Sequence, residues 1–297
     1  MRQIKNILCP VDLSDVSRST IDHAVLMAGW YESKITALHV YNPLVIPTAA
    51  YDFALAGVVP APPPTVDEVT QVREQVRSCF NAADAVEIDV QIDSGHPANR
   101  ILERARLLPS DLIVIGTHGA SGFEHLVLGS VTEKVLRKAT CPVMTVPPHG
   151  RTTAKLPFKR LLCPVDFSES SLAALEFAFS LAQEGEAELT LLYVSEWPAG
   201  VSSAFFNVAA YREEVERYAS DRLQALIPAE VSDWCRPTTR LCHGKAYREI
   251  LGTATEDSAD LIIMGVHGRN ALDLMLFGST TNQVIRRATC PVLTLRA

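Results

Sequence analysis

The sequence has no excess of positive charge, and this absence excludes two classes of partner. Its 297 residues hold 27 Lys and Arg against 34 Asp and Glu, a net charge of −7 at pH 7. Division at residue 150 leaves 12 basic against 16 acidic residues before it and 15 against 18 after it, hence −4 and −3. Neither part has the basic charge that nucleic acids or anionic membranes normally require. Neither partner is therefore expected.

Signals for export or membrane insertion are also lacking. Residues 42–64 contain no Lys or Arg, but they include Asp52 and six prolines, which an ordinary membrane-spanning helix does not tolerate. Near the amino end, the apolar stretch 7–11 is short and is followed at once by Asp12, so no signal peptide is predicted. Seven cysteines, an odd number, favour reduced thiols over a disulfide framework. We expect a soluble, cytoplasmic protein.

Several catalytic motifs are missing as well. There is no Gly-x4-Gly-Lys-Ser/Thr phosphate loop, no Gly-x-Gly-x-x-Gly dinucleotide motif, no protein kinase signature and no Ser-centred nucleophile elbow. Cys235, Cys242 and His243 do not have the spacing of a zinc site. The sequence therefore predicts no catalytic residue and no metal-binding residue.

The sequence does contain an internal duplication. Residues 7–14, ILCPVDLS, return 154 positions later as LLCPVDFS, and residues 111–119, DLIVIGTHG, return 149 positions later as DLIIMGVHG. The same 149 positions separate Gly-Ser at 129–130 and ATCPV at 139–143 from their second copies. Ordered blocks at matched spacing predict two domains, residues 1–148 and 158–297, joined by the polar linker His149–Pro157. The five-residue difference is expected in the Pro-rich segment 42–64.

Hydrophobic patterns predict alternating strands and helices in each domain. Ser14 is expected to cap the first helix, which runs to about Trp30. The other predicted elements of the first domain are the strands Ile4–Val11, Lys34–Tyr41, Ala85–Ile92, Asp111–Gly116 and Pro142–Val146, and the helices Val66–Asn81, Pro97–Leu107 and Ser130–Lys138. The second domain repeats this order between Lys159 and Leu295. Alternation with continuous apolar strands is typical of an α/β fold with a doubly wound parallel sheet and helices on both faces.

Glycines and an aspartate gather where such a sheet binds its ligand, beyond the carboxyl ends of its strands. Asp12 follows the first strand, and Gly116 and Gly119 follow the fourth, where glycine permits positive φ and close approach of a ligand. Gly129-Ser130 opens a helix whose free N–H groups and dipole favour an anion. The alternative is purely structural, because glycines after strands often form tight turns and Asp12 or Ser14 could simply cap a helix.

The pattern Gly-x2-Gly-x9-Gly-Ser, followed by Ala-Thr-Cys-Pro-Val, resembles the ATP-binding signature of the universal stress protein family. The strand that ends in Pro-Val-Asp-x-Ser is similar to that family too, and the likeness covers nearly the whole chain twice, as in its tandem-domain members. The resemblance implies two five-stranded sheets of order 3-2-1-4-5, an adenine nucleotide alpha hydrolase-like fold, and ATP, with Mg²⁺, at the junction of strands 1 and 4.

The resemblance also implies which residues contact the nucleotide. In the first domain these are Pro10, Asp12, Val40, Gly116, Thr117, His118, Gly119, Gly122, Gly129, Ser130, Val131 and Thr132. In the second domain they are Pro164, Asp166, Val194, Gly265, Val266, His267, Gly268, Gly278, Ser279, Thr280 and Thr281. The sequence departs from the family at Cys9 and Cys163, where an aliphatic residue is commoner. It departs again at Asn270-Ala271, which replaces the Ser121-Gly122 of the first domain and is expected to make the second loop stiffer.

Other roles are conceivable for some of these residues. His118 and His267 could contact phosphate or act as acid–base groups, but an imidazole that pins its loop is the favoured interpretation. Cys9 and Cys163 lie in apolar strands, where thiols act as small hydrophobic groups, and redox sensing is a minor hypothesis. The Pro-rich segment 42–64 could cover the first nucleotide site or form an interface between chains.

Partners and function follow from these features. The last strand of each domain would leave an exposed sheet edge, and exposed edges invite pairing. In the family that the chain resembles this strand makes the dimer contact, so the resemblance implies that the two domains pair through these strands as an internal pseudo-dimer, and a homodimer of chains is expected in addition. The leading hypothesis is a nucleotide-dependent sensor or regulator in the stress response, read by a regulatory protein partner. The alternatives are a weak ATPase or a self-phosphorylating protein that uses Ser130 or Thr132, and a binding module for a small ligand other than a nucleotide.

Overall fold

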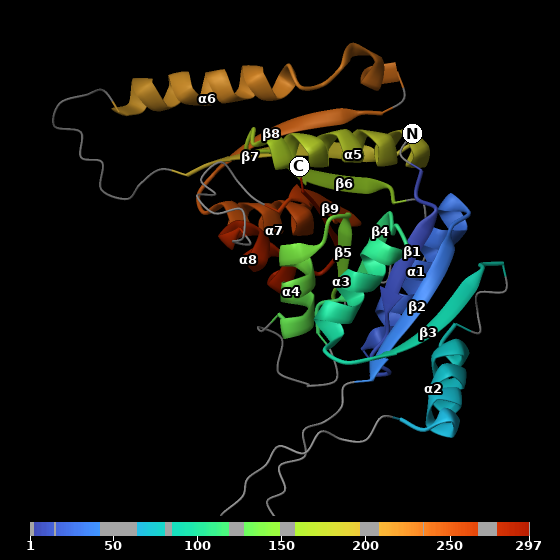
Figure 1. The fold of residues 1–297 in the computed structure, drawn as a ribbon. Helices are drawn as coiled ribbons and strands as arrows, with labels where there is room; N and C mark the ends of the chain where they lie inside the picture. The colour runs from blue at the N-terminus through green and yellow to red at the C-terminus, as the bar shows by residue number, and fades with distance from the viewer. Residues whose placement is uncertain are drawn as a thin grey trace, which may run out of the picture.

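Two similar α/β halves form one molecule in the computed structural model of the chain (Figure 1). It describes residues 3–14, 16–41, 64–80, 85–118, 128–148, 158–196, 208–233, 235–266 and 278–296. The strands are β1 Asn6–Pro10, β2 Lys34–Tyr41, β3 Ile88–Ser94, β4 Leu112–Gly116, β5 Val143–Val146, β6 Arg160–Pro164, β7 Glu188–Ser195, β8 Pro237–His243, β9 Leu261–Gly265 and β10 Val292–Leu295. The helices are α1 Ser17–Tyr31, α2 Val66–Ser78, α3 Pro97–Leu107, α4 Ser130–Lys138, α5 Glu169–Gly185, α6 Val208–Gln224, α7 Ala246–Glu256 and α8 Ser279–Arg287, with a short 3-10 helix η1 at Ala229–Asp233.

The strands form a single ten-stranded sheet in the order β3-β2-β1-β4-β5-β10-β9-β6-β7-β8. Within each half all neighbouring strands are parallel, and the order is the 3-2-1-4-5 that the family resemblance implied. The spacing between equivalent strands is 154 residues for β2 and β7 and 149 for β3 and β8, so the five-residue difference arises between them. Most of that connection, residues 42–63, lies outside the described residues, as does the predicted linker 149–157.

Most predicted elements are close to the observed ones, and α3 and α4 begin and end where expected. Two predictions were wrong. The third strand runs over Ile88–Ser94 instead of Ala85–Ile92. The first helix begins at Ser17 with Val16 at its N-cap, so Ser14 does not cap it; Ser14 bonds to Asp12 instead. The duplicate residue Ser168 does cap its helix, because its side chain accepts a hydrogen bond from the Ser171 N–H.

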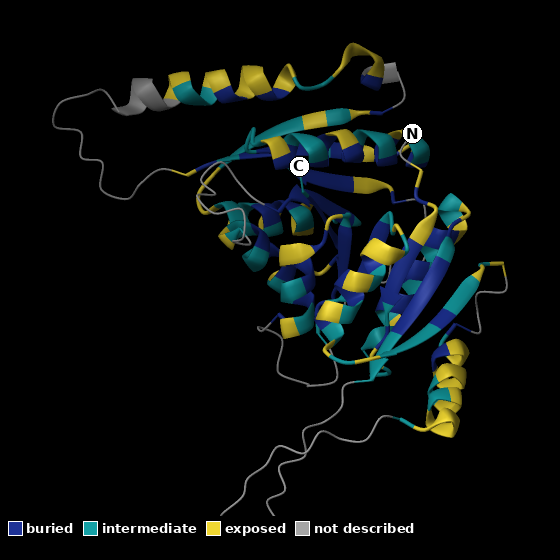
Figure 2. Cartoon of the chain, in the orientation of Figure 1, coloured by how far each residue is buried: buried dark blue, intermediate teal, exposed yellow. Residues whose placement is uncertain are grey.

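Helices cover both faces of the sheet, and each face has its own hydrophobic core (Figure 2). The core on one face includes residues of α1, α2, α5 and α6, and the core on the other includes residues of α3, α4, α7 and α8. The strands between them are nearly continuous in apolar residues because both faces are covered. Each core extends across both halves, so the halves share their hydrophobic interior.

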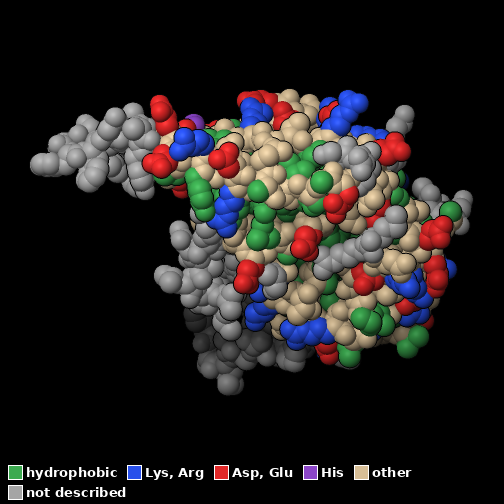
Figure 3. All heavy atoms as spheres, turned by 90° about the horizontal axis from the view of Figure 1, so that it is seen from above, with side chains coloured by type: hydrophobic (Ala, Val, Ile, Leu, Met, Phe, Trp, Pro, Cys, Tyr) green, Lys and Arg blue, Asp and Glu red, His purple; other side chains and the backbone are tan. Residues whose placement is uncertain are grey.

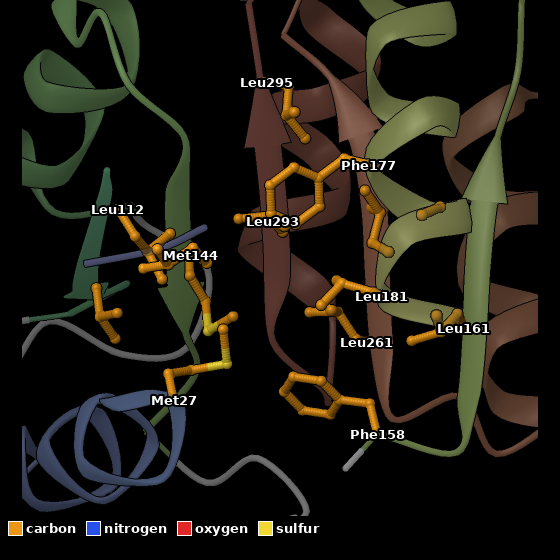
Figure 4. Close-up of a cluster of buried hydrophobic side chains, with 14 of the residues drawn as sticks. Met27, Leu112, Met144, Phe158, Leu161, Phe177, Leu181, Leu261, Leu293 and Leu295 are labelled. Carbon is orange, nitrogen blue, oxygen red and sulfur yellow. The ribbon is translucent and has the colours of Figure 1, made fainter. Parts of the chain in front are cut away.

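The two halves join where β5 and β10 pair antiparallel, as the sequence predicted for the last strands. Thr145 and Thr294 occupy equivalent positions there, and each buried hydroxyl donates to a carbonyl of the opposite strand, Val292 and Val143, at 3.1 Å. Met27 of α1 and Met144 of β5 approach each other on one side of this seam, opposite Phe158 and side chains of the second half (Figure 4). A fully buried side chain of this size stabilises the fold by roughly 1.5–3 kcal/mol.

Antiparallel pairing at the seam has a geometric consequence for function. Each half's strands run parallel to its own last strand, and β5 runs opposite to β10. The carboxyl ends of β1–β5 therefore lie along one edge of the ten-stranded sheet, where the strands end, and the carboxyl ends of β6–β10 lie along the opposite edge. Ligand sites built on those ends would be separate, one at each edge.

Charged side chains of both signs lie on the described surface (Figure 3). On the face seen in Figure 3, acidic and basic side chains are interspersed, without a continuous basic patch among the described residues. Among the helices that the structure describes, none combines the length and apolar character needed to span a membrane.

Candidate functional site

In each half the first and fourth strands pair only near their amino ends, and we call the unpaired carboxyl ends of these two strands the opening of that half. β1 pairs with β2 along five residues but with β4 only at Ile7 and Leu8. β6 pairs with β9 in the same way, only at Leu161 and Leu162. The strands part beyond these pairs, and this is also where the winding of the sheet reverses, the place at which α/β sheets bind ligands. The predicted Pro10 and Pro164 end β1 and β6 at this opening, half-buried.

Asp12 and Asp166 lie in the loops that follow β1 and β6, and each organises its loop. Oδ1 of Asp12 accepts from the Ser14 N–H at 3.1 Å and from the Ser14 hydroxyl at 2.6 Å, and it also accepts from the Ser17 hydroxyl. Oδ1 of Asp166 accepts from the Ser168 N–H at 3.0 Å and from its hydroxyl at 2.5 Å. Both carboxylates are thereby held at the opening, Asp12 exposed and Asp166 half-buried.

The residue after each aspartate is in the left-handed region of the backbone, although it is not glycine. Leu13 has φ of 60° and Phe167 has φ of 64°. Bulky residues with positive φ are uncommon and cost of order 1–3 kcal/mol, so the surrounding structure must hold them. At Phe167, the ring lies 5.4 Å from the Tyr193 ring and the Arg222 guanidinium lies 4.2 Å from its centre. The same strained turn at equivalent positions shows that it belongs to the repeated plan of the site.

The glycines that end β4 and β9 are required for packing rather than for positive φ. Among the described residues only Gly95 and Gly244 are glycines with positive φ, so the expectation for Gly116 was wrong. A Cβ at Gly116 would lie 3.1 Å from the His118 carbonyl oxygen and 3.1 Å from the Thr20 hydroxyl. At Gly265, a Cβ would lie 2.7–2.8 Å from backbone atoms at the start of α5. The first helix of the second half therefore leaves no room for a side chain at Gly265, and at Gly116 the first helix and the His118 carbonyl together leave little.

Two short helices, α4 and α8, begin at these openings. The Gly129 N–H donates to the Thr117 carbonyl at 2.9 Å, and the Gly278 N–H donates to the Val266 carbonyl at 3.1 Å. These bonds hold the start of each helix beside the end of β4 or β9. Because both N-cap residues are glycines, no N-cap side chain accepts a hydrogen bond from the first N–H groups of either helix. The N–H groups of the first turn and the positive end of the helix dipole are therefore available to an anion.

The first turn of each helix has one exposed and one buried hydroxyl. Ser130 and Ser279 are exposed at the first helical position. Thr132 and Thr281 are buried, and their hydroxyls donate to the Gly116 carbonyl at 2.7 Å and the Gly265 carbonyl at 3.0 Å. Thr132 is thus engaged with the sheet, and of the two hydroxyls considered as phosphate acceptors only that of Ser130 faces solvent.

The remaining predicted positions surround this arrangement, as far as the structure describes them. Val40 and Val194 near the ends of β2 and β7 are half-buried against the core, and Val131 and Thr280 are half-buried in the first helical turn. Thr117 is buried, and its hydroxyl forms a hydrogen bond of 2.9 Å with Nδ1 of His118, in agreement with an imidazole that pins its own loop. The predicted residues outside the described ranges are Gly119, Gly122, His267 and Gly268, together with Ser121, Asn270 and Ala271 of the loop comparison.

The cysteines beside the site do not suit redox sensing. Cys9 and Cys163 are completely buried in β1 and β6. Burial raises the pKa of the Cys9 thiol to about 12 and raises the pKa of Cys163 as well. Thiolate is the reactive form, so burial and the raised pKa values argue against the redox hypothesis. Within the described part of the chain, no group of His, Cys, Asp and Glu side chains is arranged to hold a metal ion.

Some residues that hold the strands in place, two of them at the amino ends of β1 and β6, were missed in the sequence. The Asp111 carboxylate accepts from the N–H groups of Lys5 and Asn6 at 2.8 and 2.9 Å, and Asp260 does the same for residues 159 and 160 at 2.9 and 3.0 Å. Both aspartates open a repeated block, so the duplication itself was the available signal. Gly95 and Gly244 recur at the same spacing, whereas nothing in the local sequence marks Leu13 or Phe167 as left-handed.

Comparison with known proteins agrees with this architecture. A sequence profile of the Universal stress protein family matches residues 3–147 and again residues 157–296. A universal stress protein of Mycolicibacterium smegmatis is 25% identical over 302 residues, 98% of this chain and 96% of that protein. Universal stress protein YxiE of Bacillus subtilis is 35% identical over 147 residues, 47% of this chain and 97% of its own length. The crystal structure of a universal stress protein from Archaeoglobus fulgidus superposes with a TM-score of 0.65 at 23% identity, covering 98% of this chain and 96% of the other.

Proposed function

The chain belongs to the universal stress protein family, and from that premise we propose that it binds ATP with Mg²⁺ in both halves and acts as a nucleotide-dependent sensor or regulator in the stress response. The nucleotide-binding domains would comprise residues 1–148 and 158–297. The polyphosphate would lie at the starts of α4 and α8, and the base would lie between the first and second strands of each half. A protein partner would read the state of the sites.

One observation carries this proposal: the start of a helix without a side-chain cap is held beside the parting strands in both halves. The Gly129 N–H donates to the carbonyl of Thr117, just after β4, at 2.9 Å. The Gly278 N–H donates to the carbonyl of Val266, just after β9, at 3.1 Å. Free N–H groups at a helix start are suited to phosphate oxygens. On the opposite side of the opening, the oriented carboxylates of Asp12 and Asp166 are suited to the hydroxyls of a ribose or to the amino group of adenine.

Equilibrium binding of labelled ATP in the presence of Mg²⁺ tests the proposal directly. The variant that combines Gly119→Val with Gly268→Val should bind at least tenfold more weakly, because two new side chains would stand in the signature loops. Gly29→Val and Gly252→Val form a matched control pair, since a Cβ at either glycine has no neighbour within 4 Å. Affinity equal in wild type and in the signature variant would contradict the proposal.

The alternative of a slow ATPase or a self-phosphorylating protein has its own measurement. Phosphate released from Mg·ATP by the purified protein would favour the ATPase, and label retained on the protein would favour self-phosphorylation. The exposed Ser130 is the hydroxyl of interest because Thr132 is buried and hydrogen-bonded. Loss of retained label in Ser130→Ala, but not in Thr132→Ser, would identify the acceptor. Mass spectrometry of the freshly purified, denatured protein would reveal a bound ligand other than ATP.

A further inference from the structure

Arg296, the residue after β10, reaches from the second half to a helix of the first. Its Nη2 donates to the Leu136 carbonyl at 3.4 Å and also to the Arg137 carbonyl. Both carbonyls are in the last turn of α4, where the backbone has no partners within the helix. A guanidinium at this position also interacts favourably with the negative end of the helix dipole. Arg296 therefore caps α4 from the opposite half.

On its own side of the seam, Arg296 adjoins the backbone that holds the second site. Leu295 precedes it directly, and the Leu295 carbonyl accepts from the Val266 N–H at 2.9 Å. The Val266 carbonyl in turn accepts from the N–H of Gly278, the N-cap of α8, at 3.1 Å. A ligand that orders the start of α8 would thus also order the strand end from which Arg296 projects.

The other end of α4 is the start of the first site. The helix has nine residues, Ser130–Lys138, and spans about 14 Å at the usual rise per residue. Its first turn is tied to β4, since Thr132 bonds to the Gly116 carbonyl. Because the two halves run in opposite directions at the seam, the last turn of α4 lies at the edge that carries the second site. The helix thus connects one edge of the sheet to the other.

The duplication does not supply an equivalent contact from the first half to the second. The position that matches Arg296 in the duplication is Pro147, which follows β5. Val146 before it does repeat the backbone bond, because its carbonyl accepts from the Thr117 N–H at 3.0 Å. Proline has neither an N–H nor a side-chain donor, so it cannot hold the last turn of α8. The contact at Arg296 is therefore a feature of one half and not part of the duplicated plan.

We propose that Arg296 is a positioning residue for the first nucleotide site and that it couples the two sites energetically. The coupling rests on the proposed function, since it requires a nucleotide at the start of α4 and another at the start of α8. A nucleotide at the second site orders β10 and Arg296, which holds α4 and its first-turn N–H groups in place for phosphate. Linkage makes the effect reciprocal, so nucleotide at the first site strengthens binding at the second by the same factor. We expect nucleotide at one site to raise the affinity of the other by a factor of about two to five. This factor corresponds to the free energy that a cation contributes at a helix C-terminus.

Hydrogen–deuterium exchange with peptide resolution can test this in the full chain, because it reports α4 and α8 separately. Exchange is measured without nucleotide and during titration with Mg·ATP, in wild type and Arg296→Gln, each with and without Gly268→Val to disable the second site. Without nucleotide, Arg296→Gln should speed exchange in α4 and leave α8 unchanged. With Arg296 present, Gly268→Val should raise the ATP midpoint of the α4 peptide two- to fivefold. When it is combined with Arg296→Gln, Gly268→Val should cause no further change in that midpoint.

Two further variants separate positioning from general stability. Arg296→Lys keeps a cation at the helix end and should retain part of the coupling. Arg287→Gln removes a charge from the last turn of α8 and should leave the first-site midpoint unchanged. Coupling that survives Arg296→Gln, or equal acceleration of exchange in both helices, would overturn the assignment while leaving ATP binding intact. If ATP protects neither helix in wild type, the proposed function fails and the coupling fails with it.

Discussion

The two sites share one backbone plan but differ in how the first helix of each half begins. In the second half, α5 begins at Glu169 immediately after its cap Ser168. In the first half, α1 begins at Ser17, three positions beyond the equivalent Ser14. In both halves the aspartate after the first strand accepts hydrogen bonds from the serine two residues later. Duplication has therefore preserved the loop that orients the carboxylate, while the helix behind it has changed.

This difference brings the start of the helix, both its backbone and the Ser170 side chain, closer to the glycine of the second site than any atom lies to the glycine of the first. Atoms of Ser170 and Ser171 lie within 2.8 Å of the Cβ position at Gly265, whereas the closest atoms at Gly116 are 3.1 Å away. The same signature glycine is therefore constrained to different degrees in the two halves. Substitutions at matched positions can separate what each site needs for folding from what it needs for binding.

The largest difference in the free energy of unfolding is expected between the variants Gly265→Ala and Gly116→Ala. The new methyl group at residue 265 would overlap the backbone at the start of α5, which cannot move without shifting the helix, so the free energy of unfolding should fall by about 2–3 kcal/mol. At residue 116 the overlap is slight and alanine restricts the unfolded chain, so the change should stay within about 1 kcal/mol. Urea unfolding of both variants measures this. Equal losses would show that the helix starts do not distinguish the two glycines.

A smaller difference in stability is expected between the variants Ser168→Ala and Ser14→Ala. Ser168 caps α5 through the Ser171 N–H, and loss of such a cap typically costs about 1 kcal/mol. The Ser14 hydroxyl donates to Asp12 instead of capping the helix, so its loss should cost roughly half as much. Thermal unfolding compares the two, with Ser168→Thr as a control that keeps the hydroxyl, both as N-cap acceptor and as donor to Asp166. A larger loss at Ser14 would contradict the assignment of the caps.

The smallest effect depends on pH and concerns His23 of α1, whose equivalent in α5 is Phe177. Burial lowers the pKa of His23, with opposing contributions from the Ser19 carbonyl and Asp22. The unfolded chain therefore binds a proton at His23 more readily than the folded chain does. The free energy of unfolding should fall as pH drops below about 6.5, with a slope of at most about 1.4 kcal/mol per pH unit, and should level off below the folded pKa.

His23→Phe should remove this part of the acid sensitivity. Urea unfolding of wild type and variant at pH 7.5, 6.5 and 5.5 measures the difference, and Phe177→His tests whether the same sensitivity can be introduced in the second half. If wild type and His23→Phe lose stability in parallel between pH 6.5 and 5.5, His23 does not titrate differently in the folded and unfolded states.

Much of the fold could be predicted because it depends on local patterns. Apolar runs and turn residues identified the order of the elements, and the duplication doubled every signal. The start of the first helix was the main error, because Asp12 competes for the hydroxyl of Ser14 and this competition is not visible in a residue pattern. The left-handed Leu13 was missed for a similar reason, since only the surrounding packing makes that conformation tolerable.

The sequence by itself determined the duplication, the alternation of strands and helices and the candidate residues at the ends of the first and fourth strands, because each of these is a short-range pattern. Pairing of the last strands was expected beforehand, but only the tertiary structure decided that β5 and β10 pair antiparallel, which puts the sites at opposite edges of one sheet. It also decided that Arg296 caps a helix 159 residues earlier in the chain. Contacts of that kind depend on where distant segments meet, and no local pattern in this chain encodes that meeting.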